Sequence, residues 1–141
     1  MSRRRLAIAC GLAVAVTAGC SATAPPEPDT SHAAVASVPR RHAALLAALT
    51  YVRLWARPTL GDTAWRNALQ PIVTPAYARQ LAATDPAQIP AHAVTGSPRL
   101  VSADTDVVVA DVRTDAGLIR VTVTSTGGRW LIDNASPAPA P

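Results

Sequence analysis

The segment DVVVADVRTDAGLIRVTVTSTGGRWLID, residues 106–133, decides the fold of this 141-residue chain. Apolar residues recur at every second position in its first two parts, and charged or hydroxyl residues occupy many of the positions between them. This period of two is typical of half-buried strands. The apolar positions are Val108, Ala110 and Val112 in the first part and Ile119, Val121 and Val123 in the second. The pattern predicts strands over residues 106–114 and 118–125.

Short turn sequences separate these strands from each other and from a third. Asp115-Ala116-Gly117 joins the first two, and Gly127-Gly128 leads into a strand over residues 129–133. A weaker strand over residues 93–101 is interrupted by Gly96 and Pro98, so we expect it at an edge of the sheet or bulged. Together the four strands predict an antiparallel meander.

Upstream of the strands the apolar period becomes helical. Pro58 ends a first helix, and the expected buried face of that helix consists of Leu45, Ala48, Leu49, Val52, Trp55 and Ala56. Asp62 is expected to cap a second helix that ends at Pro71, and Thr74 followed by Pro75 to begin a third. The expected fold is α+β, with three N-terminal helices packed on a curved four-stranded antiparallel sheet.

The N-terminus has the organisation of a secretory signal. Three arginines at 3–5 precede the apolar run 6–16, which is shorter than the roughly 20 residues that span a bilayer. The residues Ala18-Gly19-Cys20 that follow resemble the lipobox of bacterial lipoproteins, although Thr17 stands where that family usually has Leu. The resemblance implies that Cys20 becomes the lipidated N-terminus of the mature protein. Cleavage after Ala24, or an uncleaved single anchor, are the alternatives.

Composition then divides the chain into four parts. Few large apolar residues occur between Cys20 and the first helix, and such a composition does not bury enough surface to order itself. The expected parts are a lipoprotein signal peptide over 1–19, a Pro/Ser/Ala-rich tether over 20–39, a domain over 40–135 and a Pro-rich tail over 136–141. Fully extended, the tether would reach roughly 60 Å, at about 3 Å for each residue.

Charge and cysteine content exclude several classes of function. The chain has 13 basic residues, all Arg, but from Cys20 onward ten arginines face nine acidic residues, so the mature chain is nearly neutral. No basic stripe with interleaved aromatics remains, so we expect no nucleic-acid binding. Two cysteines, of which Cys10 lies in the apolar run, do not form a disulfide framework or a structural zinc site. We expect neither a metal nor another cofactor.

The order of elements and several local sequences resemble the NTF2-like superfamily. The resemblance covers about residues 40–133 and rests on the sequences LQPIVTP at 69–75, TDP at 84–86, VTG at 94–96 and GRWLI at 128–132. Within the superfamily, the chain more closely resembles small extracytoplasmic domains of Gram-positive and actinobacterial conjugation or secretion apparatus and of Mce-associated proteins. It implies a cone in which helices pack into the concavity of a bent sheet. Its motifs are packing and turn residues, so they bear on the fold rather than on an activity.

One catalytic arrangement is suggested by the same resemblance. Some NTF2-like proteins resemble ketosteroid isomerases, which use a carboxylate in an apolar cone together with a Tyr or a neutral acid. The candidate residues here are Asp111, Tyr51 and Tyr77. The competing interpretation, which we favour, is that Asp111 pairs with Arg120 across the hairpin on a solvated face.

These observations lead to one expected function and one alternative. We expect a non-catalytic assembly or interaction module, anchored by Cys20 on the extracytoplasmic face of the cell membrane and working with protein partners of a conjugation, secretion or transport apparatus. The alternative is a binder of small apolar ligands, or an isomerase, that uses the interior of the cone.

Overall fold

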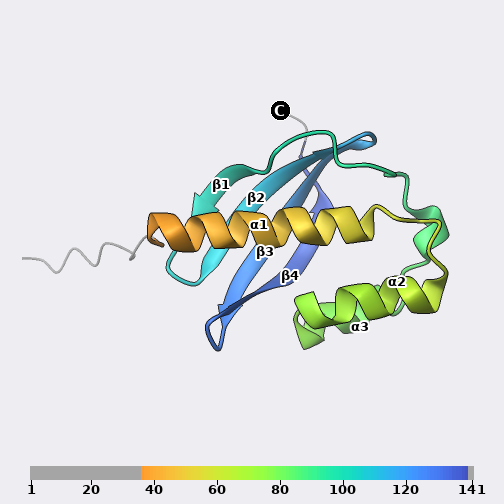
Figure 1. Ribbon diagram of the computed structural model, residues 1–141, viewed down its shortest axis with the longest axis horizontal. Helices are drawn as coiled ribbons and strands as arrows, with labels where there is room; N and C mark the ends of the chain where they lie inside the picture. The colour runs from red at the N-terminus through yellow and green to blue at the C-terminus, as the bar shows by residue number, and fades with distance from the viewer. Residues whose placement is uncertain (1–35, 140–141) are drawn as a thin grey trace, which may run out of the picture. The chain divides into compact units, whose positions relative to one another are not determined.

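The computed structural model describes residues 36–139, all of which belong to one compact unit. The predicted signal peptide, Cys20 and most of the tether lie outside the described residues. Three helices come first, followed by four strands, with two short 3₁₀ turns between them (Figure 1). In chain order these are α1 (Val38–Trp55), α2 (Asp62–Leu69), η1 (Gln70–Ile72), α3 (Pro75–Leu81), η2 (Pro86–Gln88), β1 (Arg99–Ala103), β2 (Val107–Thr114), β3 (Gly117–Thr126) and β4 (Arg129–Pro137). The α+β class is therefore confirmed.

The sheet is an open antiparallel meander in which each strand pairs with its neighbours in the sequence. β2 and β3 pair without interruption, from Val107 opposite Thr124 to Thr114 opposite Gly117. β1 is the expected edge strand and has a register shift between Leu100 and Ser102. A second shift, between Thr122 and Val123, interrupts the pairing of β3 with β4. The four predicted strands are confirmed, although the first begins later than expected.

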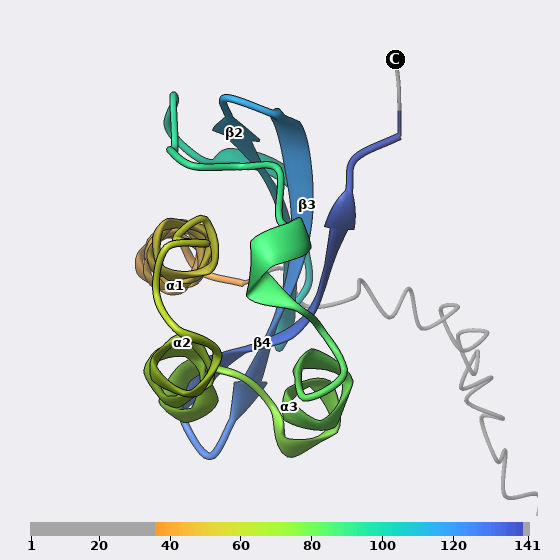
Figure 2. The ribbon, with the colours of Figure 1, turned by 90° about the vertical axis from the view of Figure 1, so that its right-hand side faces the viewer.

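The core lies between the sheet and the helices. Figure 2 looks nearly along α1 and shows α1 and α2 on one side of the sheet. The predicted strand positions that face the helices are buried, and they pack with side chains of all three helices. The largest fully buried side chains are Trp65, Tyr51, Leu69, Ile132, Val52, Val108, Val112, Val121, Val123 and Asp111. The Trp65 indole donates a 3.0 Å hydrogen bond to the carbonyl of Trp55, which ties α2 to the end of α1.

The buried face of α1 differs from the predicted one. Ala44, Ala48, Tyr51 and Val52 are buried, whereas Leu45 and Leu49 are only half-buried. Alanines on the inner face let the helix axis approach the strands closely, and Tyr51 then supplies the bulk. The helix carries apolar residues around most of its circumference, so the period alone did not define the inner face.

The N-terminal end of α1 is attached to the sheet by Arg40. Its guanidinium lies 3.1 Å from an Asp106 carboxylate oxygen, 3.2 Å from the Ser125 hydroxyl and 5.4 Å from the ring centroid of Trp130. These contacts join α1 to the turn before β2 and to the β3–β4 hairpin.

Several predicted boundaries are wrong by a few residues. α1 begins at Val38, with proline in its first turn, so the ordered domain starts inside the predicted tether. β4 continues to Pro137, because Ser136 and Pro137 still pair with β3, so the predicted tail at 136–141 begins too early. Gly61, not Asp62, occupies the N-cap of α2.

The caps of the later helical segments follow the expected chemistry. The Thr74 hydroxyl accepts a hydrogen bond from the Tyr77 amide, which confirms the predicted start of α3.

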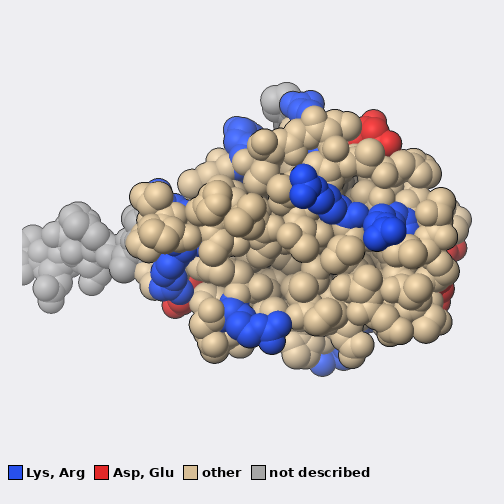
Figure 3. Space-filling view, viewed as in Figure 1, with Lys and Arg blue, Asp and Glu red and all other residues tan. Residues whose placement is uncertain are grey.

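No helix within residues 36–139 has the length and apolarity needed to cross a bilayer. Arginine side chains are spread over several separate places on the face that carries α1 (Figure 3).

Candidate functional site

Asp111 is held between two arginines on adjacent strands. The register places it opposite Arg99 of β1 and opposite Arg120 of β3. Arg120 donates two hydrogen bonds, from Nε at 2.8 Å and from Nη2 at 3.1 Å, and Arg99 donates a third at 2.9 Å. The Asp111 side chain is 1% exposed. The hydrogen bonds from Arg120 are the main reason that the pKa of Asp111 lies below its usual range.

The expected pairing of Asp111 with Arg120 is confirmed, and its environment is more buried than expected. Arg99 was not foreseen as a second partner, because its position opposite Asp111 depends on where the edge strand begins. Arg120 in turn has its pKa raised, chiefly by the hydrogen bonds to Asp111. Both oxygens of the carboxylate are occupied by arginine, so the group is a structural ion pair on the sheet.

Tyr51 and Tyr77 form a separate pair inside the helical layer. Their hydroxyl oxygens lie 2.8 Å apart, and their ring centroids lie 6.0 Å apart with an interplanar angle of 52°. Both side chains are buried, and burial raises the pKa of each hydroxyl. The backbone of Ala135 lies near the Tyr77 hydroxyl and lowers its pKa, against the larger effect of burial. The pair therefore joins α1, α3 and β4.

The three candidate residues do not converge on one place. Asp111 alternates along β2 with Ala110 and Val112, which belong to the core that contains the tyrosines. Because successive side chains of a strand point to opposite faces, Asp111 lies on the face of the sheet away from that core. Trp65 and the tyrosine pair occupy the interior instead. The arrangement of a carboxylate and a tyrosine around one cavity is therefore absent among residues 36–139.

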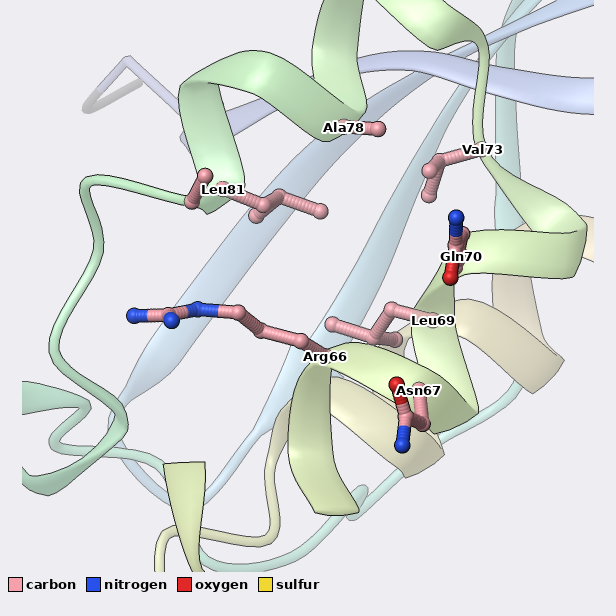
Figure 4. A pocket seen from close by; sticks show the side chains of 8 residues that line it. Arg66, Asn67, Leu69, Gln70, Val73, Ala78 and Leu81 are labelled. Atoms are coloured by element: carbon pink, nitrogen blue, oxygen red, sulfur yellow. The ribbon is translucent and has the colours of Figure 1, made fainter. Parts of the chain in front are cut away.

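A hollow that the sequence did not indicate lies between α2 and α3 (Figure 4). Its volume is about 280 Å³. The lining residues are Arg66, Asn67, Leu69, Gln70, Val73, Ala78, Leu81 and Ala82. In Figure 4 the side chains of Leu69, Val73, Ala78 and Leu81 surround the space, and Arg66 extends along its edge. We call this feature the α2–α3 hollow.

β1 forms an exposed edge of the sheet. It pairs only with β2, so its other side has no strand neighbour among the described residues. Leu100 is 37% exposed and Val101 is 41% exposed. Free strand edges with apolar side chains are suited to pairing with another chain. Two further exposed apolar residues, Val38 and Leu46, lie on α1.

Residues suited to metal binding are dispersed. Within residues 36–139, no three His, Cys, Asp or Glu side chains lie close enough together to hold a metal ion.

Asp115 accepts hydrogen bonds from the backbone amides of His92 and Ala93. These hydrogen bonds lower the pKa of Asp115 and hold the segment before β1 in place. This acid therefore has a structural role in the described part of the chain.

No protein-family model matches the chain, and searches of curated proteins and of solved structures also find no match.

Proposed function

We propose that this chain is an extracytoplasmic lipoprotein whose NTF2-like domain is a non-catalytic interaction module. The observation that carries the proposal is the order of residues 3–21, in which arginines, an apolar run and the sequence Ala18-Gly19-Cys20-Ser21 follow one another. A first helix that begins at Val38 is consistent with this order, because residues 21–37 then separate the lipid from that helix. The three helices before a four-stranded meander support the NTF2-like assignment.

Lipidation of Cys20 would restrict the domain to the membrane surface. Two anchoring signals are needed for stable attachment, and a diacylglycerol group with an amide-linked acyl chain such as palmitate supplies them. Confinement near the membrane raises the effective concentration of the domain at a membrane-bound partner. A modest contact surface is then sufficient for association.

The surface that we assign to the partner is the edge of β1. Its backbone is free to add a strand, and Leu100 and Val101 offer apolar contacts beside that edge. The opposite edge is less accessible, because η1 and α3 contact β4 and the Thr74 amide donates a 2.8 Å hydrogen bond to the carbonyl of Ile132. The partner is a protein of a membrane-associated conjugation, secretion or transport apparatus, and no nucleic acid is involved.

In-cell crosslinking tests this proposal. A C-terminally tagged copy carries a photo-crosslinking amino acid at Val101 or, as the matched control, at the exposed Arg79 of α3. We expect membrane-machinery subunits to be captured from position 101 and not from position 79, and we expect Cys20→Ala to abolish the capture. Recovery of the protein alone from both positions, or capture that persists unchanged in Cys20→Ala, would contradict the proposal.

A further inference from the structure

A second hollow, polar in character, lies on the face of the sheet away from the core. Its volume is about 320 Å³, and the lining residues are Gly96, Ser97, Arg99, Asp111, Arg113 and Leu118. Asp111 and Arg113 are two residues apart on β2, so their side chains point to the same face. The register places Arg99 and Arg120 on either side of Asp111. We call this feature the outer hollow.

The outer hollow has an excess of positive charge. Asp111 is the only acid in its lining, and both carboxylate oxygens already accept hydrogen bonds from arginine. Arg120 makes two of these three bonds and compensates the carboxylate, so the charges of Arg99 and Arg113 remain. Arg99 is 71% exposed, and the exposed Arg113 makes no side-chain hydrogen bond or ion pair within residues 36–139. Two guanidinium groups are therefore available to a ligand.

Both arginines are positioned by their neighbours. The buried Asp111 holds Arg99 through a 2.9 Å hydrogen bond. The Thr95 amide donates a 2.9 Å hydrogen bond to the carbonyl of Arg113, which brings Gly96 beside the same residue. A Cβ atom at Gly96 would lie 3.3 Å from the Cβ of Arg113 and 3.8 Å from its Cδ, so glycine leaves room for the stem of this arginine. Groups that are positioned in advance lose less conformational freedom when a ligand binds.

Two neighbouring guanidinium groups favour a ligand with two negative charges. A carboxylate or a phosphate diester carries one charge and would leave one arginine uncompensated. A phosphate monoester carries about 1.5 to 2 negative charges at pH 7 and has three acceptor oxygens, to which guanidinium groups donate pairs of hydrogen bonds. At about 30 Å³ for each small group, the outer hollow has room for roughly ten non-hydrogen atoms, which is a phosphate and a short substituent.

We propose that the outer hollow binds the dianionic phosphate group of a phosphate monoester, which lies between the guanidinium groups of Arg99 and Arg113. Soluble phosphate esters and the headgroup of phosphatidic acid both contain this group, and the experiment separates the two sources. Binding requires neither the lipid on Cys20 nor a protein at the edge of β1. A failed test would therefore leave the proposed function unaffected, and the reverse also holds.

The test is an NMR titration of the ¹⁵N-labelled full chain in nanodiscs of zwitterionic lipid, at constant ionic strength and about pH 7.5. Methyl phosphate is the dianionic probe, and dimethyl phosphate, which is similar in size but has one charge, is the matched comparison. We expect methyl phosphate to shift the amide resonances of Gly96, Ser97 and Arg113 saturably, with a Kd of about 1 mM. Dimethyl phosphate should bind about fivefold more weakly, because it offers one charge to two guanidinium groups.

Arg113→Gln is the decisive variant. The side chain is exposed and has no partner in the described part of the chain, so its replacement should leave the fold intact. The substitution should weaken methyl phosphate binding about fivefold and remove most of the preference for methyl phosphate over dimethyl phosphate. Arg79→Gln alters an exposed arginine of α3 outside the lining, and this control should bind methyl phosphate like the unaltered chain.

A change of lipid distinguishes the two sources of the phosphate group. Nanodiscs that contain phosphatidic acid are compared with nanodiscs that contain phosphatidylglycerol at matched surface charge, without added ligand. Shifts of the Gly96, Ser97 and Arg113 amides with phosphatidic acid alone would assign the site to the lipid headgroup. Shifts that require added methyl phosphate would assign it to a soluble ester.

Three results would overturn the inference. Equal affinity for methyl phosphate and dimethyl phosphate would show that the outer hollow does not select a dianion. Equal weakening by Arg113→Gln and Arg79→Gln would show a general charge effect. Shifts that do not saturate would show that the outer hollow has no phosphate site.

Discussion

Replacement of Asp111 by Asn tests the ion pair that links three strands. The substitution keeps the size of the side chain and removes its charge, so the charge-assisted hydrogen bonds from Arg120 and Arg99 are weakened or lost. The side-chain exposures decide how much each bond contributes. Arg99 is 71% exposed and Arg120 is 32% exposed, whereas Asp111 is almost fully buried.

The expected loss in the free energy of unfolding is about 2 kcal/mol at pH 7. Solvent screens the bond from the exposed Arg99, so its contribution is close to that of a surface pair, about 0.5 kcal/mol. The two bonds from the more buried Arg120 contribute most of the rest, about 1.5 kcal/mol together after the same discount. Removing the full charge of a buried pair can cost about 3–5 kcal/mol, which sets an upper bound.

The pH dependence gives the prediction a second, independent part. The folded-state pKa of Asp111 is depressed, so its stabilising contribution is complete above the unfolded value of about 3.9 and disappears as the pH falls through the folded value. The difference in stability between the unaltered chain and Asp111→Asn should therefore be constant from neutral pH to about pH 5 and shrink in more acidic solution.

Urea unfolding followed by tryptophan fluorescence measures both parts. At pH 7 the midpoint should fall by about 1 M with an unchanged slope. Asp104→Asn, which alters an exposed acid in the turn before β2, is the matched control and should leave the midpoint unchanged. A midpoint for Asp111→Asn equal to that of the unaltered chain, or a difference that does not shrink as the pH is lowered from 5 to 2, would refute the reasoning.

Three further sets of substitutions each test one local feature, and urea unfolding measures all of them. Tyr77→Phe should cost about 2 kcal/mol, because it leaves the buried Tyr51 hydroxyl without its partner. Tyr51→Phe should cost only about 1 kcal/mol, because the Tyr77 hydroxyl still has the backbone of Ala135 nearby. Equal costs would contradict this asymmetry. Thr74→Val removes the cap of α3 and should cost about 1–2 kcal/mol, so no change would show that the cap is dispensable. Gly117→Ala should destabilise by more than about 1 kcal/mol because φ is 120°, whereas Gly61→Ala, at φ −57° with open space around its Cβ position, should cost only a few tenths; equal effects would contradict the argument.

The strands were predictable from the sequence because local chemistry specifies them. Alternation defined β2 and β3, and the glycines at 117 and 127–128 have the positive φ values that tight turns require. The buried face of α1 was less predictable, since Leu45 and Leu49 are only half-buried although they are more apolar than the buried Ala44 and Ala48. Apolar residues on several sides of a helix leave the choice of inner face to tertiary packing.

The candidate residues show the same limit. The cross-strand rule was sufficient to pair Asp111 with Arg120, because both lie on strands joined by a short turn. Arg99 was missed because its register depends on an irregular edge strand. The convergence of Asp111 with Tyr51 and Tyr77 was the less favoured interpretation, suggested by a family resemblance, and the alternation of β2 places the carboxylate on the other face.

The α2–α3 hollow has a physical origin that explains why sequence patterns do not reveal it. α2 and α3 are short helices joined by η1, and each is positioned by its own contacts, α2 by the hydrogen bond of Trp65 to Trp55 and α3 by the hydrogen bonds of Thr74 to β4. With both helices fixed independently, the gap between them is closed only if the facing side chains are large enough. Ala78 and Ala82 present a single methyl group each, and close packing therefore fails at this point. Small residues in a single helix do not by themselves predict a hollow. The hollow arises because Trp65 and Thr74 fix the two helices independently and the alanines of α3 do not fill the space between them, so no sequence motif marks it.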